Sequence, residues 1–74
     1  MKKQRKKFVV CIKSEPDSDL EVRKIYQVLP DEKAAEEDYI RVIDESGEDY
    51  LYPAAYFFPV ELPQAAEDAL LRAA

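Results

Sequence analysis

The stretch of residues 39–60 constrains the fold of this chain most, because two strand-like runs in it flank the protein's single glycine. Glycine adopts positive φ without a steric penalty, so we expect the chain to reverse at Gly47. Two turns are compatible with this position: a three-residue loop, Glu45-Ser46-Gly47, and a two-residue turn, Ser46-Gly47. Either turn predicts a β-hairpin, and the two differ in which side chains face each other.

Charges beside the turn favour the three-residue loop. A two-residue turn would create two like-charge pairs across the strands, whereas the longer loop creates one, between Asp44 and Glu48. The longer loop also gathers four apolar or aromatic side chains on one face, where a core can form. These are the cross-strand pairs Val42 with Tyr50 and Ile40 with Tyr52.

The composition favours a small domain without catalytic chemistry. Seventy-four residues make one domain, and 47% hydrophobic residues suffice for a compact barrel without a deep active-site cavity. The chain has no histidine, the commonest general base, and Cys11 is its single cysteine, so a disulfide framework and a cysteine metal site are excluded. Cys11 lies in an apolar run, which is typical of an inert, packed thiol. We therefore expect a protein that is not an enzyme and has no cofactor.

Charge is distributed unevenly along the chain. Five cations stand within the first seven residues: Lys2, Lys3, Arg5, Lys6 and Lys7. From Phe8 onward, six basic residues stand against sixteen acidic ones, which leaves a net charge of −10. Such a body repels phosphate backbones, so we expect no nucleic-acid binding through it. The basic N-terminus is expected to be a flexible lead-in. The alternative is that it contacts RNA or the ribosome.

The acidic residues beside the turn, including Asp44 and Glu48, lack the twelve-residue calcium-loop pattern, and no metal site is expected there. The apolar run Phe8–Ile12 has five residues, whereas a signal peptide needs about 7–15 and a membrane span about 20. The sequence therefore predicts a soluble, cytoplasmic protein that does not enter a membrane.

Further elements follow from local patterns. Strands are expected at 8–12, 24–29 and 58–62, with Pro59 tolerable only at an edge or bulge. The proline and small residues of 53–56 favour a 3₁₀ turn, and 63–74 favour a helix with Pro63 in its first turn. The predicted core contains Ile12, Ile25, Val28, Ile40, Val42, Tyr50, Tyr52 and Val60.

This order of elements resembles the five-stranded Src-homology-3 (SH3) barrel, and most closely in the run Asp49-Tyr50-Leu51-Tyr52-Pro53-Ala54-Ala55-Tyr56-Phe57. That run is similar to the family's closing pattern of an aromatic-aliphatic strand, a proline, two small residues, a tyrosine and an apolar residue. The chain also resembles a group of short uncharacterised bacterial proteins, which implies a fold and no activity. The resemblance implies an all-β protein with a five-stranded antiparallel SH3-like barrel over 8–62. The residues themselves predict a flexible 1–7 before this barrel and a C-terminal α-helix over 63–74 after it.

The resemblance also suggests a binding surface. Pro53 and Tyr56 match two positions of the family's aromatic groove for proline-rich ligands. The groove's tyrosine motif at the end of strand 1 and its tryptophan are absent, so recognition of a polyproline helix is not expected. The expected function is a small protein-interaction or accessory module, a monomer or weak homodimer that binds an unidentified protein. Its predicted contact residues are Tyr39, Pro53, Tyr56 and Phe57, and Tyr26 is expected to be exposed with them.

Overall fold

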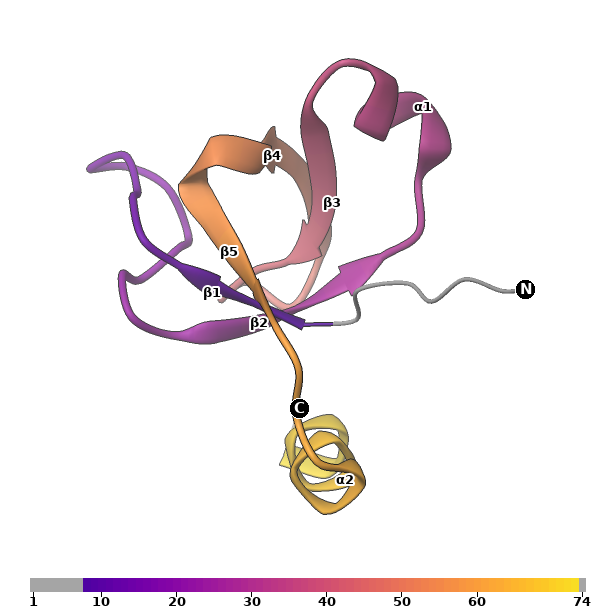
Figure 1. Ribbon diagram of the computed structural model, residues 1–74. Coiled ribbons are helices and arrows are strands. Elements are labelled where there is room, and N and C mark those ends of the chain that lie inside the picture. The colour runs from indigo at the N-terminus through magenta and orange to yellow at the C-terminus, as the bar shows by residue number, and fades with distance from the viewer. Residues whose placement is uncertain (1–7, 74) are drawn as a thin grey trace.

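The computed structural model describes residues 8–73, which form a five-stranded antiparallel sheet and three helical segments (Figure 1). The strands follow the order β4-β3-β2-β1-β5, so β4 and β5 are the two edges and the sheet is not closed. The elements are β1 (Phe8–Cys11), β2 (Ile25–Leu29), α1 (Glu32–Glu36), β3 (Tyr39–Ile43), β4 (Asp49–Pro53), η1 (Ala54–Tyr56), β5 (Phe57–Val60) and α2 (Gln64–Ala73).

The β3–β4 hairpin has the predicted register. Its strands pair Val42 with Tyr50 and Ile40 with Tyr52. The backbone N–H of Asp44 donates to the Glu48 carbonyl at 3.1 Å, and Gly47 donates to the Asp44 carbonyl at 2.9 Å. Gly47 has φ +87°, in the left-handed region that glycine tolerates. The three-residue loop is therefore confirmed, as is the role of Gly47 in it.

The core lies on one face of this curved sheet. Its buried members are Val9, Cys11, Leu20, Tyr26, Val42 and Phe57, with Val28, Ile40, Tyr52 and Tyr56 packed against them. Strand alternation explains the set, because Val9 and Cys11 share one face of β1 and Tyr26 and Val28 share one face of β2.

The prediction that Ile12, Ile25, Tyr50 and Val60 belong to the core is wrong. Ile12 and Tyr50 are 48% and 49% exposed, because Ile12 follows the end of β1 and Tyr50 lies near the hairpin tip, beyond the core. Ile25 is 37% exposed because it alternates with the buried Tyr26. Val60 is half-buried beside Phe8, its β1 partner, on the face away from the core.

Three strands differ slightly in their bounds from the prediction. β1 ends at Cys11, β2 begins at Ile25, and β5 runs from Phe57 to Val60 where 58–62 was expected. The 3₁₀ turn η1 is shorter by one residue and leads directly into β5. Pro59 lies in β5, an edge strand, where its missing N–H breaks no inner ladder.

α1 forms in the charged, alanine-containing stretch between β2 and β3. Asp31 caps its N-terminus by accepting a hydrogen bond from Ala34 N–H at 3.0 Å. The same carboxylate pairs with Arg41 of β3 at 2.8 Å, and Arg41 also reaches Asp49 of β4 at 3.0 Å. A helix of five residues is unstable by itself, so these bonds to the sheet hold it in place.

α2 confirms the predicted C-terminal helix. It begins after Pro63, whose carbonyl accepts from Glu67 N–H at 3.0 Å. In Figure 1 the helix lies below the sheet and is joined to β5 by a short connection. None of the helices within residues 8–73 is long and apolar enough to cross a membrane.

Candidate protein-interaction site

Three of the four predicted contact residues meet at one end of the sheet. Tyr39 begins β3 and lies opposite Pro53, the last residue of β4. Ala54 N–H then donates to the Asp38 carbonyl at 2.8 Å, which anchors η1 beside the start of β3. Tyr56 ends this turn, three residues after Pro53. Tyr39 is 41% exposed, and Pro53 and Tyr56 are half-buried.

Phe57 is not part of this surface. It is 5% exposed and belongs to the core, where its ring stands edge-on to Tyr52 with centroids 6.2 Å apart. Tyr26 is buried too, at 6% exposed. The expectation that both rings are exposed is wrong, because strand alternation turns them to the inner face. Phe57 instead supports the site, since its ring lies 6.5 Å from that of Tyr56.

The Tyr56 ring is held by two residues of the loop between β1 and β2. Its hydroxyl donates to the Glu15 carboxylate, and this bond raises the pKa of Tyr56. The Lys13 ammonium lies 5.7 Å from the ring centroid, within range of a cation–π contact. Sequence reasoning did not identify Glu15 or Lys13, which lie some forty positions from Tyr56. The pairing of Cys11 with Phe57 and the hydrogen bond from Ile12 N–H to the Tyr56 carbonyl, at 2.8 Å, bring the two segments together.

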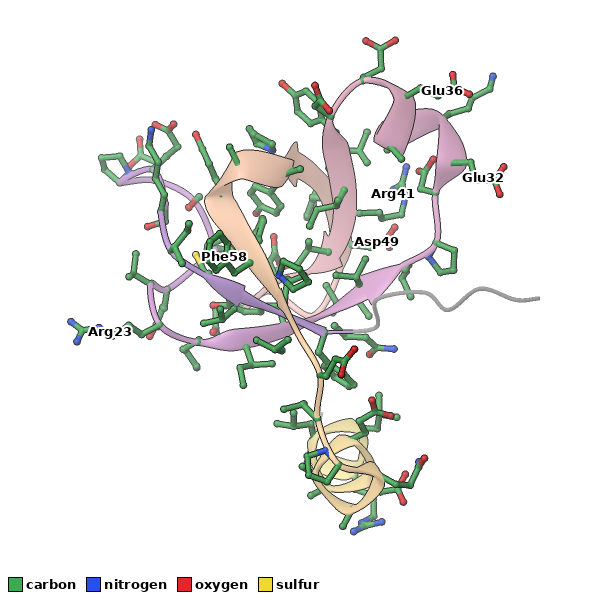
Figure 2. The ribbon with its side chains drawn as sticks, viewed as in Figure 1. Arg23, Glu32, Glu36, Arg41, Asp49 and Phe58 are labelled. Atoms are coloured by element: carbon green, nitrogen blue, oxygen red, sulfur yellow. The ribbon has the colours of Figure 1, made fainter. Side chains whose placement is uncertain are left out.

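A shallow groove continues from Tyr39 across the outer face of the sheet. Its volume is about 470 Å³, and it lies between α1 and strands β3 and β4. Tyr39 and Leu51 give it an apolar floor, with Leu51 46% exposed. Arg41 and Asp49, labelled in Figure 2, face each other across this surface. The charged side chains of the groove lining are of both signs, Asp31 and Glu37 acidic and Lys33 and Arg41 basic.

The acidic residues at the hairpin turn are occupied by structural hydrogen bonds. Asp44 is 5% exposed and accepts from Ser46 N–H at 3.0 Å and from the Tyr52 hydroxyl at 2.6 Å. Burial by itself would raise the pKa of Asp44, but these hydrogen bonds outweigh it and the pKa is lowered. Burial, and then the bond to Asp44, raises the pKa of Tyr52. This carboxylate is therefore a support for the hairpin.

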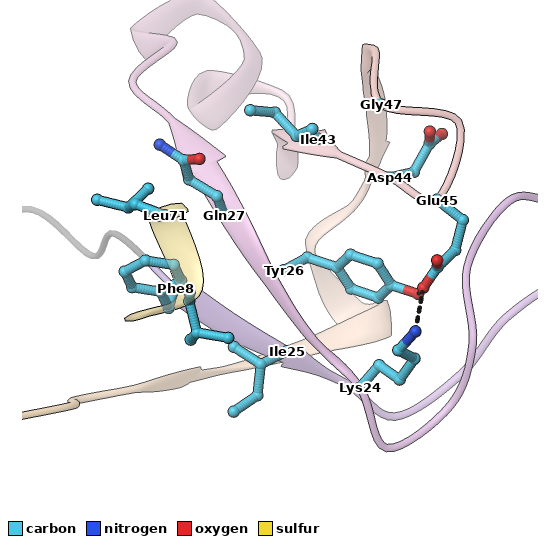
Figure 3. A pocket seen from close by; sticks show the side chains of 11 residues that line it. Phe8, Lys24, Ile25, Tyr26, Gln27, Ile43, Asp44, Glu45, Gly47 and Leu71 are labelled. Carbon is cyan, nitrogen blue, oxygen red and sulfur yellow. Dashed lines mark hydrogen bonds and ion pairs between the residues drawn. The ribbon is translucent and has the colours of Figure 1, made fainter. Parts of the chain in front are cut away.

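The carboxylate of Glu45 also has a structural role, because it links the hairpin turn to β2 and the residue before it. It accepts from the Tyr26 hydroxyl at 2.6 Å and pairs with Lys24 at 2.9 Å, as Figure 3 shows. The bond from Tyr26, followed by that from Lys24, lowers the pKa of Glu45. Within residues 8–73, no three histidine, cysteine or carboxylate side chains are grouped so as to hold a metal ion. Cys11 is fully buried, which raises the pKa of its thiol and opposes reactivity.

The five cations of the N-terminus, Lys2, Lys3, Arg5, Lys6 and Lys7, lie outside the described residues. Comparison of the chain with protein-family models, curated proteins and solved structures found no match.

Proposed function

We propose that this protein is a small, non-catalytic interaction module that binds a protein partner through Tyr39, Pro53 and Tyr56. One observation carries the proposal: the β3–β4 register and η1 bring these residues together, with Tyr39 41% exposed. Tyrosine is a strong interface residue because its ring buries a large area and has few rotamers to lose. Tyr56 is already held by Glu15 and Phe57, so it loses little further freedom on binding.

The surroundings favour a partner segment that is apolar. The charged side chains around the site are of both signs: Glu15, Asp31 and Glu37 are acidic, and Lys13, Lys33 and Arg41 are basic. Tyr39 and Leu51 supply the apolar contact area of the adjoining groove. The groove over Leu51 gives an extended segment room to continue beyond the tyrosines.

The fold is proposed to be an SH3-like barrel. Its support is the order of elements, with a long loop after β1, a charged helical turn before β3, a tight turn before β4 and a 3₁₀ turn before β5. Polyproline binding is not part of the proposal, because the tyrosine motif and tryptophan of such grooves are missing from the sequence.

The non-catalytic assignment rests on how the carboxylates are used. Asp31 caps α1, Asp44 supports the hairpin, and Glu45 joins Tyr26 to Lys24. Each is bound to its own chain and has a lowered pKa, which suits a structural anion better than a general acid. The expected cytoplasmic location rests on the sequence alone.

Tyr39 on β3 and Tyr50 on β4 are both exposed, so the proposed binding site can be tested with a matched control. The full chain is used to capture partners from extracts of its own cells, and the affinity of each purified partner is then measured by calorimetry. Tyr39→Ala is expected to weaken binding at least tenfold, as is typical of a central interface tyrosine. Tyr50→Ala, at 49% exposed on β4 and near the hairpin tip, is the control and should leave the affinity unchanged.

Equal affinities for the wild type and Tyr39→Ala would refute this site. Capture of RNA or ribosomal particles that is lost on deletion of residues 1–7 would favour the alternative function. In that case the affinity for RNA should fall as the salt concentration rises, because contacts to phosphate weaken in salt.

A further inference from the structure

The two edge strands of the sheet differ in whether they can accept a further strand. In an antiparallel pair, the N–H and C=O groups of successive residues point alternately toward the neighbouring strand and away from it. At β5, the hydrogen bond from Ile12 N–H to the Tyr56 carbonyl fixes this alternation, so the backbone nitrogen of Pro59 points away from the sheet. Proline has no N–H to donate. The β5 edge is therefore blocked.

The β4 edge keeps its outward donors. The hydrogen bond from Asp44 N–H to the Glu48 carbonyl marks a bonded pair of the hairpin. Alternation from this pair turns the N–H and C=O groups of Asp49 and Leu51 away from β3. Outside the β3–β4 ladder, none of the backbone hydrogen bonds within residues 8–73 involves Asp49 or Leu51. Such alternate donors and acceptors along an edge form a template for another extended chain.

The groove between α1 and strands β3 and β4 adjoins this edge. Tyr39, Arg41 and Leu51 line it from the sheet. In the part of the chain that the structure describes, no strand lies beyond β4, which forms one edge of the sheet (Figure 1). An added strand would place every second side chain on the same face as Leu51. Leu51 is 46% exposed, so an apolar side chain at that position would cover it.

The tyrosine site continues the line of β4. Pro53 ends the strand opposite Tyr39, and η1 then leads to Tyr56, so a segment paired along β4 would reach this site at one end. Backbone pairing also restricts the kind of segment. A polyproline helix lacks the N–H donors that a β-ladder needs, whereas an extended segment without proline has them at alternate residues.

We propose that the protein partner adds a strand to β4, with its backbone bonded to Asp49 and Leu51 and an apolar side chain over Leu51. This inference rests on the proposed function, because it specifies how the partner of the tyrosine site binds. The occupant is an extended, proline-free segment of another protein. Main-chain hydrogen bonds supply its affinity, and alternate side chains supply its selectivity.

Amide hydrogen exchange of the full chain alone tests the edge without a partner. The Asp49 and Leu51 amides should exchange rapidly, whereas the Tyr50 and Tyr52 amides, which face β3, should be protected. Protection of the Leu51 amide in dilute protein would mean that the chain covers its own edge. Protection that appears only as the protein concentration rises would mean that a second copy covers it. Either result would overturn the inference.

A peptide probe tests the pairing itself. Random peptides displayed on phage are selected with the full chain as bait, and calorimetry gives the affinity of a selected peptide. Leu51→Pro removes the outward donor and fills the edge with its ring, so it should weaken binding about tenfold or more. Leu51→Ile keeps the donor and the side-chain volume and should bind like the wild type. Tyr50→Ala also keeps every outward donor, in agreement with its use as a control above.

Three results of this experiment would contradict strand addition. They are the absence of any selectable peptide, selected peptides that are rich in proline, and equal affinities for Leu51→Pro and Leu51→Ile. Circular dichroism verifies that each variant is folded. If Leu51→Pro does not fold, an ester in place of the Tyr50–Leu51 amide, introduced by chemical synthesis, removes the same donor and keeps the leucine side chain. It should weaken binding by roughly fivefold or more.

Tyr39→Ala distinguishes failure of this inference from failure of the proposed function. If Tyr39→Ala weakens binding of the peptide and neither Leu51→Pro nor the ester does, strand addition is wrong and the tyrosine site stands. If none of the three changes weakens binding, both are wrong. If Tyr39→Ala and the loss of the Leu51 donor both weaken binding, the partner uses the edge and the tyrosine site together.

Discussion

Gly47 determines the register of the hairpin, and its φ of +87° makes it a direct test. A Cβ built at this position meets no atom within 4 Å, so the penalty for substitution comes from the backbone conformation and not from a clash. Gly47→Ala should therefore lower the free energy of unfolding by about 1 kcal/mol. Urea unfolding measures this change. An unchanged midpoint would show that the residue tolerates a side chain in this turn.

Asp44 links the stability of the hairpin to pH. Its pKa is lowered in the folded chain, so its contribution is complete above the unfolded pKa of about 4 and is lost as the pH falls below that value. Asp44→Asn should destabilise the protein by about 1–3 kcal/mol at pH 7, because buried hydrogen bonds to a charged acceptor are lost. The variant should also lose less stability than the wild type between pH 5 and pH 3.

Urea titrations across this range check the prediction for Asp44. Asp17→Asn, on an exposed loop, is the control and should follow the wild type. Parallel pH profiles for the wild type and Asp44→Asn would contradict the assignment.

At the level of elements, the stability of α2 depends on contacts outside the helix. Ten residues are too few to hold a helix in water, so its contact with the sheet through Leu70, Leu71 and Phe8 must contribute. Deleting residues 64–74 exposes Phe8 and should cost about 1 kcal/mol, or roughly 4–8 °C in Tm for a domain of this size. Calorimetry at low protein concentration, where any dimer is dissociated, isolates this effect. An unaltered Tm would mean that the helix does not stabilise the sheet.

The 3₁₀ turn η1 links two strands and also orients two aromatic rings. The Tyr56 carbonyl accepts a hydrogen bond from Ile12 N–H, just after β1, and Ala54 N–H donates to the Asp38 carbonyl, just before β3. The turn thereby sends Phe57 into the core and leaves Tyr56 at the surface.

For the whole molecule, the charge of −10 from Phe8 onward dominates long-range interactions. Screening at about 0.15 M salt acts over roughly 8 Å and reduces this repulsion from phosphate without reversing its sign. We therefore expect that a chain lacking residues 1–7 does not retain RNA in filter binding at 0.15 M salt. Tight RNA binding by this truncated chain would contradict the expectation and require a basic surface that the net charge conceals.

Local patterns sufficed for the hairpin, the 3₁₀ turn and the C-terminal helix. Each of these depends on neighbours in sequence: a single glycine for the reversal, a proline with small residues for η1, and helix formers after Pro63 for α2. The same patterns did not distinguish the two faces of a strand, so Ile25 was assigned to the core and Tyr26 to the surface.

Most of the elements and the reversal at Gly47 follow from the amino-acid sequence, because backbone preferences act over a few residues. The exposure of each aromatic ring follows from the packing of the sheet, since it depends on which face of each strand meets the core. The tertiary structure also decided that Glu15 and Lys13 hold Tyr56, because a loop distant in sequence had to be brought back across the sheet. Val10, Ile25 and Phe58 share a face for the same reason, because strands β1, β2 and β5 become neighbours only on folding.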